Sequence, residues 1–154
     1  MSGLESLYQE LILDHSKRPV GRGIHDQADG RSATSHQRNP ICGDEITLRV
    51  RVSDDGTRVQ DVTWEGSGCS ISQASASMLV SLLREDGGED GMPREAASAL
   101  VDGFRTALRS RGSVQLPEET FGDAAALSGV SRYTARVKCA MLAWVAFEDA
   151  LARA

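Results

Sequence analysis

The sequence predicts an α+β fold, and three observations support this prediction. Residues 44–53 alternate apolar and polar side chains, as expected for a strand with one buried face. The segments on either side of the strand region instead repeat apolar residues at helical spacing. The predicted strands follow one another between a first helix and several later helices. Segregation of this kind favours an antiparallel sheet with one covered face over a parallel α/β sheet.

The first predicted helix begins after Ser2 and stops before Pro19. Ser2 and Glu5 have the spacing of a capping box, and a proline disfavours helix in the residue before it. Residues 21–30 are polar and glycine-rich, which predicts a loop. The apolar face of the helix comprises Leu4, Leu7, Tyr8, Leu11 and Ile12.

The strand region contains one strong and two weaker candidates. Residues 44–53 form the strong strand, and residues 54–56 have the composition of a hairpin turn. Residues 58–64 return from this turn, and the break in their alternation at Asp61 indicates a bulge or a sheet edge. Residues 32–38 are the weakest strand candidate.

Helical spacing returns in the second half of the chain. It predicts helices over residues 71–82, over residues 93–112 with the proline in the first turn, and over residues 121–127. An acidic, glycine-rich loop is expected at residues 85–91. Ser131 is the predicted cap of a last helix that runs to the end of the chain. We find no repeat, and we expect residues 1–154 to form a single domain.

Composition narrows the classes of partner and the compartment. The formal net charge of −5 argues against nucleic acid as the main partner, since phosphate binding requires a basic face. The chain has no segment typical of a signal peptide or of a transmembrane helix, so we expect a cytoplasmic protein with no membrane partner. Three cysteines cannot all pair with one another, and thiols in a reducing compartment act as metal ligands, catalytic groups or core residues.

Three thiols and one carboxylate stand out because each precedes or begins a predicted element. Cys42 and Asp44 flank a glycine before the strong strand, Cys69 lies between the returning strand and a helix, and Cys139 lies in the first turns of the last helix. Three thiolates and a carboxylate would suit zinc or iron in a tetrahedral site. Since spacing alone does not fix these ligands together, the alternative remains that the cysteines pack as small apolar side chains.

Three local sequences resemble the signature segments of SufU proteins, which belong to the broader IscU/NifU N-terminal family. They are NPICGD at residues 39–44, GSGCSIS at 66–72 and RVKCAMLAW at 136–144. The first helix is also similar, so the resemblance covers nearly the whole chain. It implies a small antiparallel sheet of three strands with helices packed on it, the fold of SufE/NifU-like and IscU-type proteins.

The resemblance also implies the chemistry of the site. The metal would be zinc, held by Cys42, Asp44, Cys69 and Cys139. The protein would accept persulfide sulfur from a pyridoxal-phosphate cysteine desulfurase of the SufS type, as a sulfurtransferase whose acceptor is Cys42. Arg136 is expected to steer ligand exchange or to hold the released thiolate, and with Lys138 it could offset the negative charge of the ligands.

Two features favour SufU over IscU within this resemblance. IscU proteins usually have histidine before the third cysteine, where this chain has Lys138. The stretch over residues 86–115 resembles an insertion found in SufU. In addition, residues 133–137 do not match the chaperone-recognition motif of IscU proteins, which argues against a dedicated Hsp70 partner.

Two other functions remain open at this point. The same four residues could assemble a [2Fe–2S] cluster, or hold iron, for transfer to apo-proteins. Alternatively, zinc could only stabilise the fold of an interaction module. Sulfur taken up by a carrier would pass to a downstream SUF scaffold or to apo-proteins.

Several aromatic and histidine residues receive structural predictions. Trp64 and Trp144 are expected in the core, and Tyr8 is expected to contact it. His15 and His36 could touch the site or a partner, but the preferred interpretation is that both are surface or capping residues.

Overall fold

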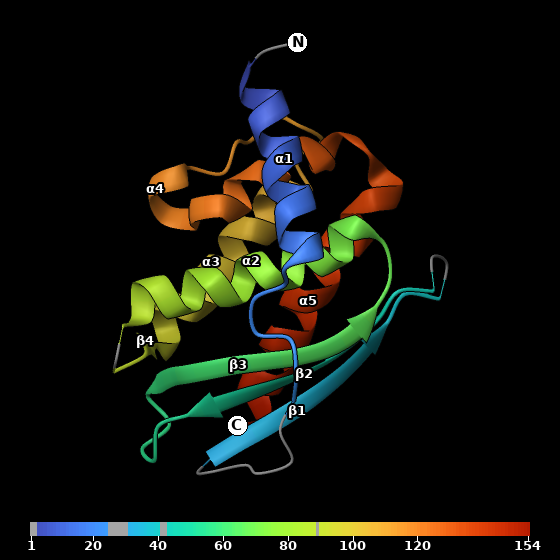
Figure 1. Ribbon diagram of the computed structural model, residues 1–154. Coiled ribbons are helices and arrows are strands. Elements are labelled where there is room, and N and C mark those ends of the chain that lie inside the picture. Colours follow the sequence, from blue (N-terminus) through green and yellow to red (C-terminus); the bar gives the residue numbers. More distant parts are fainter. Residues whose placement is uncertain (1–2, 25–30, 41–42, 89) are drawn as a thin grey trace.

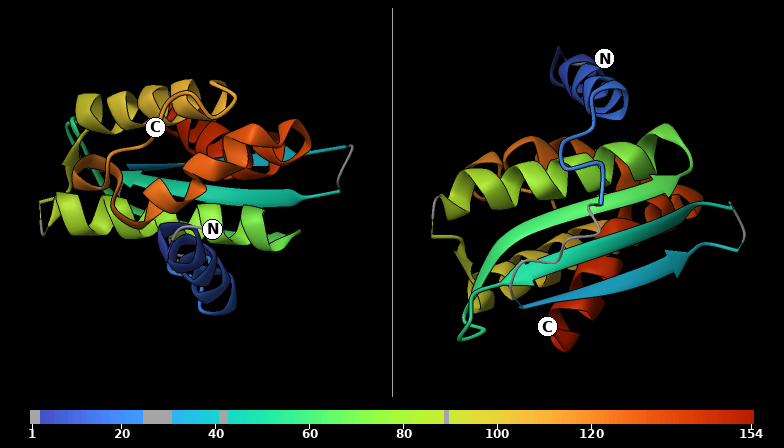
Figure 2. Two further views of the ribbon diagram at one scale, coloured as in Figure 1. Left: turned by 90° about the horizontal axis from the view of Figure 1, so that it is seen from above. Right: turned by 60° about the horizontal axis from the view of Figure 1, so that its bottom comes forward.

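The computed structural model describes residues 3–24, 31–40, 43–88 and 90–154, and it confirms the α+β class. An antiparallel sheet carries helices on one face, and none of the helices in the described ranges covers its other face (Figures 1 and 2). The strands are β1 (Arg31–Arg38), β2 (Glu45–Val52), β3 (Arg58–Ser67) and β4 (Met92–Pro93), in that order across the sheet. The helices are α1 (Gly3–Lys17), α2 (Ser70–Gly87), α3 (Arg94–Leu108), α4 (Glu118–Phe121), the 3-10 helix η1 (Gly122–Arg132) and α5 (Thr134–Arg153).

The strong strand of the sequence is β2, and its alternating side chains form the floor of the core. Ile46, Leu48, Val50 and Val52 are all buried beneath the helices. Both predicted core tryptophans are buried as well, and Trp144 stacks on Phe104 with ring centroids 3.9 Å apart. The predicted weak strand at residues 32–38 is confirmed as β1.

The predicted irregularity beside Asp61 is a β-bulge. Arg51 of β2 pairs with Asp61 of β3, and the next pair is Val52 with Val59, so Gln60 is the extra residue. Asp61 also accepts a hydrogen bond from Arg84 of α2 at 3.1 Å, which links the bulge to the covering helix.

The expected three-stranded sheet is wrong by one strand, because β4 pairs with the edge of β3 through Arg58 and Val59. Arg58 Nη1 also donates a hydrogen bond of 2.9 Å to the carbonyl oxygen of Gly91. A strand of two residues is too short to show alternation, so the sequence does not predict β4. For the acidic segment before it, residues 85–91, the sequence predicts a loop. The first three residues of that segment belong instead to α2, which continues to Gly87.

Helix boundaries in the second half differ from the predictions in detail. Helix α3 has Pro93 at its N-cap rather than in its first turn, and it ends at Leu108 rather than near Gly112. The predicted short helix is divided between α4 and η1. Ser131 does not cap α5, because its hydroxyl donates to the carbonyl oxygen of Ser128 within η1.

Helix α1 packs against α2 and η1 and ends before Pro19, as predicted. Tyr8, Leu11 and Ile12 contact the core, whereas Leu7 is half exposed. The predicted capping box lies outside the described side chains. Among the described residues, no helix is both long and apolar enough to cross a membrane.

Candidate metal centre

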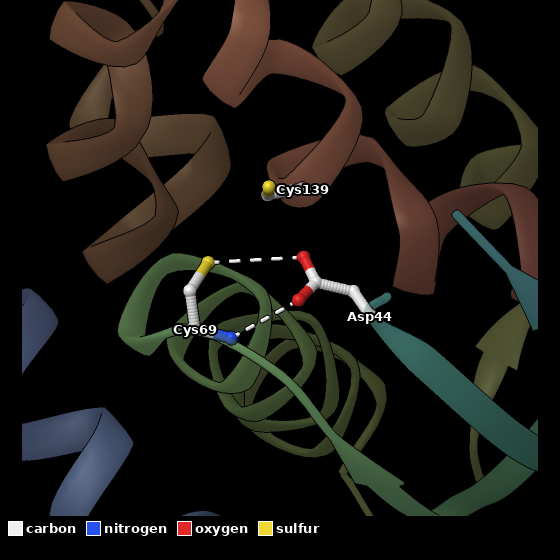
Figure 3. A group of neighbouring side chains, drawn as sticks. All are labelled: Asp44, Cys69 and Cys139. Carbon is white, nitrogen blue, oxygen red and sulfur yellow. Dashed lines mark hydrogen bonds between the residues drawn. The ribbon is translucent and has the colours of Figure 1, made fainter. Parts of the chain in front are cut away.

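The beginnings of three elements bring a carboxylate and two thiols together, as Figure 3 shows. Asp44 immediately precedes β2, Cys69 is the N-cap residue of α2, and Cys139 lies in the second turn of α5. One ligand atom from each residue lies within 4.8 Å of the others. The structure therefore brings together three of the four predicted ligands from distant parts of the chain. Cys42, the fourth, lies outside the described residues.

A tight turn before β2 places Asp44 at the site. Gly43 has a positive φ of 76°, and its N–H donates to the carbonyl oxygen of Asn39 at 2.8 Å. The N–H of Asn39 in turn donates to the carbonyl oxygen of Asp44 at 2.8 Å. These two bonds close the turn and fix the backbone from which the carboxylate projects.

Gly68 allows the start of α2 to approach this carboxylate. A Cβ at Gly68 would lie 2.5 Å from Asp44 Oδ1 and 2.6 Å from Ser72 Oγ, and its φ of +155° is rarely adopted by other residues. The close approach lets the N–H of Cys69 donate to Asp44 Oδ1 at 3.1 Å. One carboxylate oxygen is therefore held by the backbone, and Oδ2 faces the thiols.

The donor set and its spacing fit a tetrahedral metal ion. A thiolate sulfur about 2.3 Å and a carboxylate oxygen about 2.1 Å from a tetrahedral zinc ion lie roughly 3.6 Å apart. Cys69 Sγ and Asp44 Oδ2 are 3.8 Å apart. Asp44 is only 2% exposed, and none of the described lysines and arginines forms an ion pair with it. A bound cation would stabilise a buried carboxylate in this situation, so the fit is chemical as well as geometric.

Access to the centre is one-sided. Cys69 is exposed, while Cys139 is 5% exposed and Asp44 is buried. The site is therefore buried at Asp44 and Cys139, at the starts of β2 and α5. It has one open side, exposed to solvent at Cys69 at the start of α2. A reactant can reach the open side without any helix moving away.

The predicted cations lie beside the centre rather than in it. Arg136 and Lys138 are both exposed on α5. The guanidinium of Arg136 lies over the ring of Tyr133, 5.7 Å from its centroid, and borders a cavity of about 790 Å³ between α1, η1 and the start of α2. Its predicted role is therefore not visible as a contact with the ligand set.

Ser72 belongs to the site and was not singled out in the sequence. Its hydroxyl donates to the carbonyl oxygen of Cys69 at 3.0 Å and lies 3.9 Å from Cys69 Sγ. The available signal was its position one helical turn after Cys69 at the start of α2. Ser72 restrains the backbone from which Cys69 projects.

Neither predicted histidine is near the ligand set. His15 is buried, which contradicts its interpretation as a surface or capping residue: its ring nitrogens lie 2.7 Å from Ser77 Oγ and 2.9 Å from Asp123 Oδ2. His36 is half exposed on β1, as expected of a surface residue, and lies 2.9 Å from Glu45 Oε1.

Comparisons with known proteins agree with this architecture. Residues 7–140 match the NifU-like N-terminal domain. The chain is 37% identical to the iron–sulfur cluster assembly scaffold protein IscU of Streptococcus pyogenes, covering 99% of this chain and 87% of the relative. It is 36% identical to the zinc-dependent sulfurtransferase SufU of Bacillus subtilis, covering 99% of this chain and 94% of the relative.

A solved structure shows the same fold. It is a protein of Fervidobacterium islandicum described as a candidate iron–sulfur cluster assembly scaffold for the SUF system, with 30% identity and a TM-score of 0.69 over 97% of this chain and 99% of the other. Sequence and structure thus agree over almost the full length. The chain belongs to the NifU-like N-terminal domain family, together with the IscU and SufU proteins of iron–sulfur cluster assembly.

Proposed function

We propose that this chain is a zinc-dependent sulfur carrier of SUF-type iron–sulfur cluster assembly in the cytoplasm. It would accept persulfide sulfur at Cys42 from a SufS-type cysteine desulfurase and pass it to a SUF scaffold or to apo-proteins. The observation that carries this proposal is the convergence of Asp44, Cys69 and Cys139 at a centre with one open side.

Asp44, Cys69 and Cys139 would hold the metal, with Cys42 as the fourth and exchangeable ligand. Bound zinc would keep thiol ligands deprotonated and arranged around it. The hydrogen bond from the Cys69 N–H fixes one oxygen of Asp44 and leaves the other directed at the thiols. Ser72 and Gly68 hold the Cys69 backbone in place, so three ligands are preorganised by the fold.

The transfer step is a thiol–persulfide exchange. The Cys42 thiolate attacks the terminal sulfur of the partner's persulfide, and a new bond forms between Cys42 Sγ and that sulfur. The bond between the terminal sulfur and the partner's cysteine sulfur breaks, and its electron pair leaves with the partner as a thiolate. One sulfur–sulfur bond forms as another breaks, so the oxidation state is conserved and no external oxidant or reductant is needed. Arg136, exposed beside the site, would hold the Cys42 thiolate once it has left the metal.

Features of this chain support a carrier of the SufU type. The Bacillus subtilis relative is named a zinc-dependent sulfurtransferase. Lys138 stands where IscU proteins usually have a histidine, so the imidazole ligand of a cluster scaffold is lost. The segment resembling the SufU insertion contains β4 and α3.

The test is alanine release by a SufS-type desulfurase in the presence of this protein loaded with zinc. We expect strong stimulation by the wild type and none by Cys42→Ala, with the fold and most of the zinc retained in the variant. Ser113→Ala, an exposed control, should stimulate as the wild type does. Unimpaired stimulation by Cys42→Ala would contradict the role of Cys42.

A second candidate function is a scaffold for a [2Fe–2S] cluster, favoured by the names of the Streptococcus and Fervidobacterium relatives. In that case the iron and sulfide would be cargo held by the same ligand set. Acid-labile sulfide retained after reconstitution and delivered to an apo-protein would support the scaffold. If instead each cysteine variant unfolded similarly and none had a specific transfer defect, the metal would be purely structural.

A further inference from the structure

Three exposed cations line one hollow between the end of α3 and the first turns of α5. We call this set the α5 basic surface, and it comprises Arg109, Arg111 and Lys138. Within the described ranges none of the three forms an ion pair with a carboxylate, whereas Arg105, which also lines the hollow, pairs with Glu148 at 2.6 Å. In a chain of net charge −5, this surface is a local reversal of charge.

The surface has an apolar hollow at its centre. A cavity of about 390 Å³ lies between the end of α3 and the first turns of α5. Arg109, Arg111 and Lys138 line it together with an apolar group: Leu108, Val137, Met141 and Val145. An apolar hollow with a cationic rim suits a segment that combines one apolar side chain with several carboxylates.

The backbone of the segment after α3 is specifically folded and packed. Arg111 has a φ of +56°, a conformation found in no other non-glycine residue of the described ranges. Arg132 packs on Gly112, where an added Cβ would lie 2.8 Å from Arg132 Cγ. The end of η1 is thereby packed against the segment after α3, which carries Arg109 and Arg111.

We propose that the α5 basic surface docks an acidic segment of the sulfur-donating partner, with one apolar side chain of that segment in the hollow. The identity of the partner rests on the proposed function; the acidic and apolar character of the segment rests on the surface itself. Lys138 precedes Cys139 in α5, so the docked segment would contact the helix that carries one of the proposed metal ligands. An acidic protein is favoured over nucleic acid because the rest of this chain is strongly acidic and would repel a long phosphate backbone.

The first test uses a dye-labelled synthetic peptide of glutamates with one central leucine, titrated by fluorescence anisotropy at low salt. We expect the double variant R109E/R111E to bind it at least about tenfold more weakly than the wild type. The matched control is K17E/R18E, which changes the same charge at two exposed cations at the end of α1 and should bind like the wild type. Equal weakening in both double variants, no weakening in R109E/R111E, or tighter binding of duplex DNA than of the peptide would overturn the proposal.

The second test measures alanine release by the desulfurase as a function of the concentration of this protein. We expect R109E/R111E to raise the KM for this protein about tenfold with kcat at saturation unchanged, whereas Cys42→Ala removes kcat. A lower kcat at unchanged KM would overturn docking at this surface. If the wild type itself gives no stimulation, the proposed function fails, and the peptide titration still decides whether the surface binds acidic segments.

Discussion

Two of the groups of buried polar side chains in the described residues differ in how fully their hydrogen bonds are satisfied. At the junction of α1, α2 and η1, both ring nitrogens of His15 have partners, and Ser77 Oγ also accepts the N–H of Val20 at 2.8 Å. At the candidate metal centre the carboxylate of Asp44 is buried as well, yet its hydrogen-bond partners among the described residues are one backbone N–H and a thiol at 3.8 Å.

This difference in hydrogen bonding indicates different roles for the His15 group and the Asp44 group. A satisfied buried network fixes the packing of the elements that supply it, and it needs nothing further. A buried carboxylate without a cation, facing thiols from two other elements, is complete only when a cation is added. We therefore predict that the His15 group serves stability and that the Asp44 group serves the proposed metal binding, and the following variants separate these roles.

The largest effect is expected for Asp44→Asn on zinc binding. Loss of a charged ligand should lower the zinc affinity at least about 100-fold, since even outer-sphere changes reach 10–100-fold at such sites. The free energy of unfolding without metal should change by less than about 1 kcal/mol, because the variant also removes a buried charge. Competition with a chromogenic chelator measures the affinity, and an unchanged affinity would exclude Asp44 as a ligand.

His15→Ala should give the reverse pattern. It leaves Ser77 and Asp123 without their partner and should lower the free energy of unfolding by about 2–3 kcal/mol, while zinc affinity stays unchanged. Urea denaturation of the metal-free protein measures the stability. His36→Ala, at a half-exposed histidine, is the control and should stay within about 0.5 kcal/mol of wild type. A matching loss in His36→Ala would remove the distinction.

Gly68→Ala should affect both properties, because its Cβ would collide with Asp44 and Ser72. We expect a loss of about 1–3 kcal/mol in stability together with weaker zinc binding. Gly129→Ala is the control, since a Cβ there meets nothing within 4 Å. Wild-type zinc affinity in Gly68→Ala would show that the close approach of α2 to Asp44 is dispensable.

The smallest effect is expected for Asp55→Ala in the exposed β2–β3 turn. Hydrogen bonds from Ser53 and Thr57 lower the pKa of Asp55 from 3.8 to about 2. The contribution of Asp55 is therefore fully present above pH 3.8 and lost as the pH falls through about 2. Wild type and variant should differ slightly in thermal stability at pH 5 and converge near pH 2, and a gap that widened on acidification would contradict this sign.

Much of the fold could be predicted because its signals are local. The alternation in β2, the proline that ends α1 and the helical spacing of α2 each depend on neighbouring residues only. Strand β4 could not be predicted, since it consists of two residues held by contacts with β3. The burial of His15 also depends on Ser77 and Asp123, which are distant in the chain and follow no pattern.

The candidate site could be predicted only in part from the sequence. No short motif links Cys69 to Cys139, so spacing alone did not distinguish ligands from core cysteines, and the resemblance to SufU supplied the grouping. The structure brings both cysteines to Asp44 through the starts of α2 and α5. Their binding of zinc and the role of Cys42 stay predictions.

The most direct test of the account is to locate the transferred sulfur. The zinc-loaded protein is mixed with a SufS-type desulfurase and cysteine, quenched with an alkylating agent, digested and analysed by mass spectrometry. The account predicts a trapped persulfide on the peptide that contains Cys42, with Cys69 and Cys139 unmodified by sulfur. Persulfide on Cys69 or Cys139 instead, or none on any of the three cysteines, would contradict it.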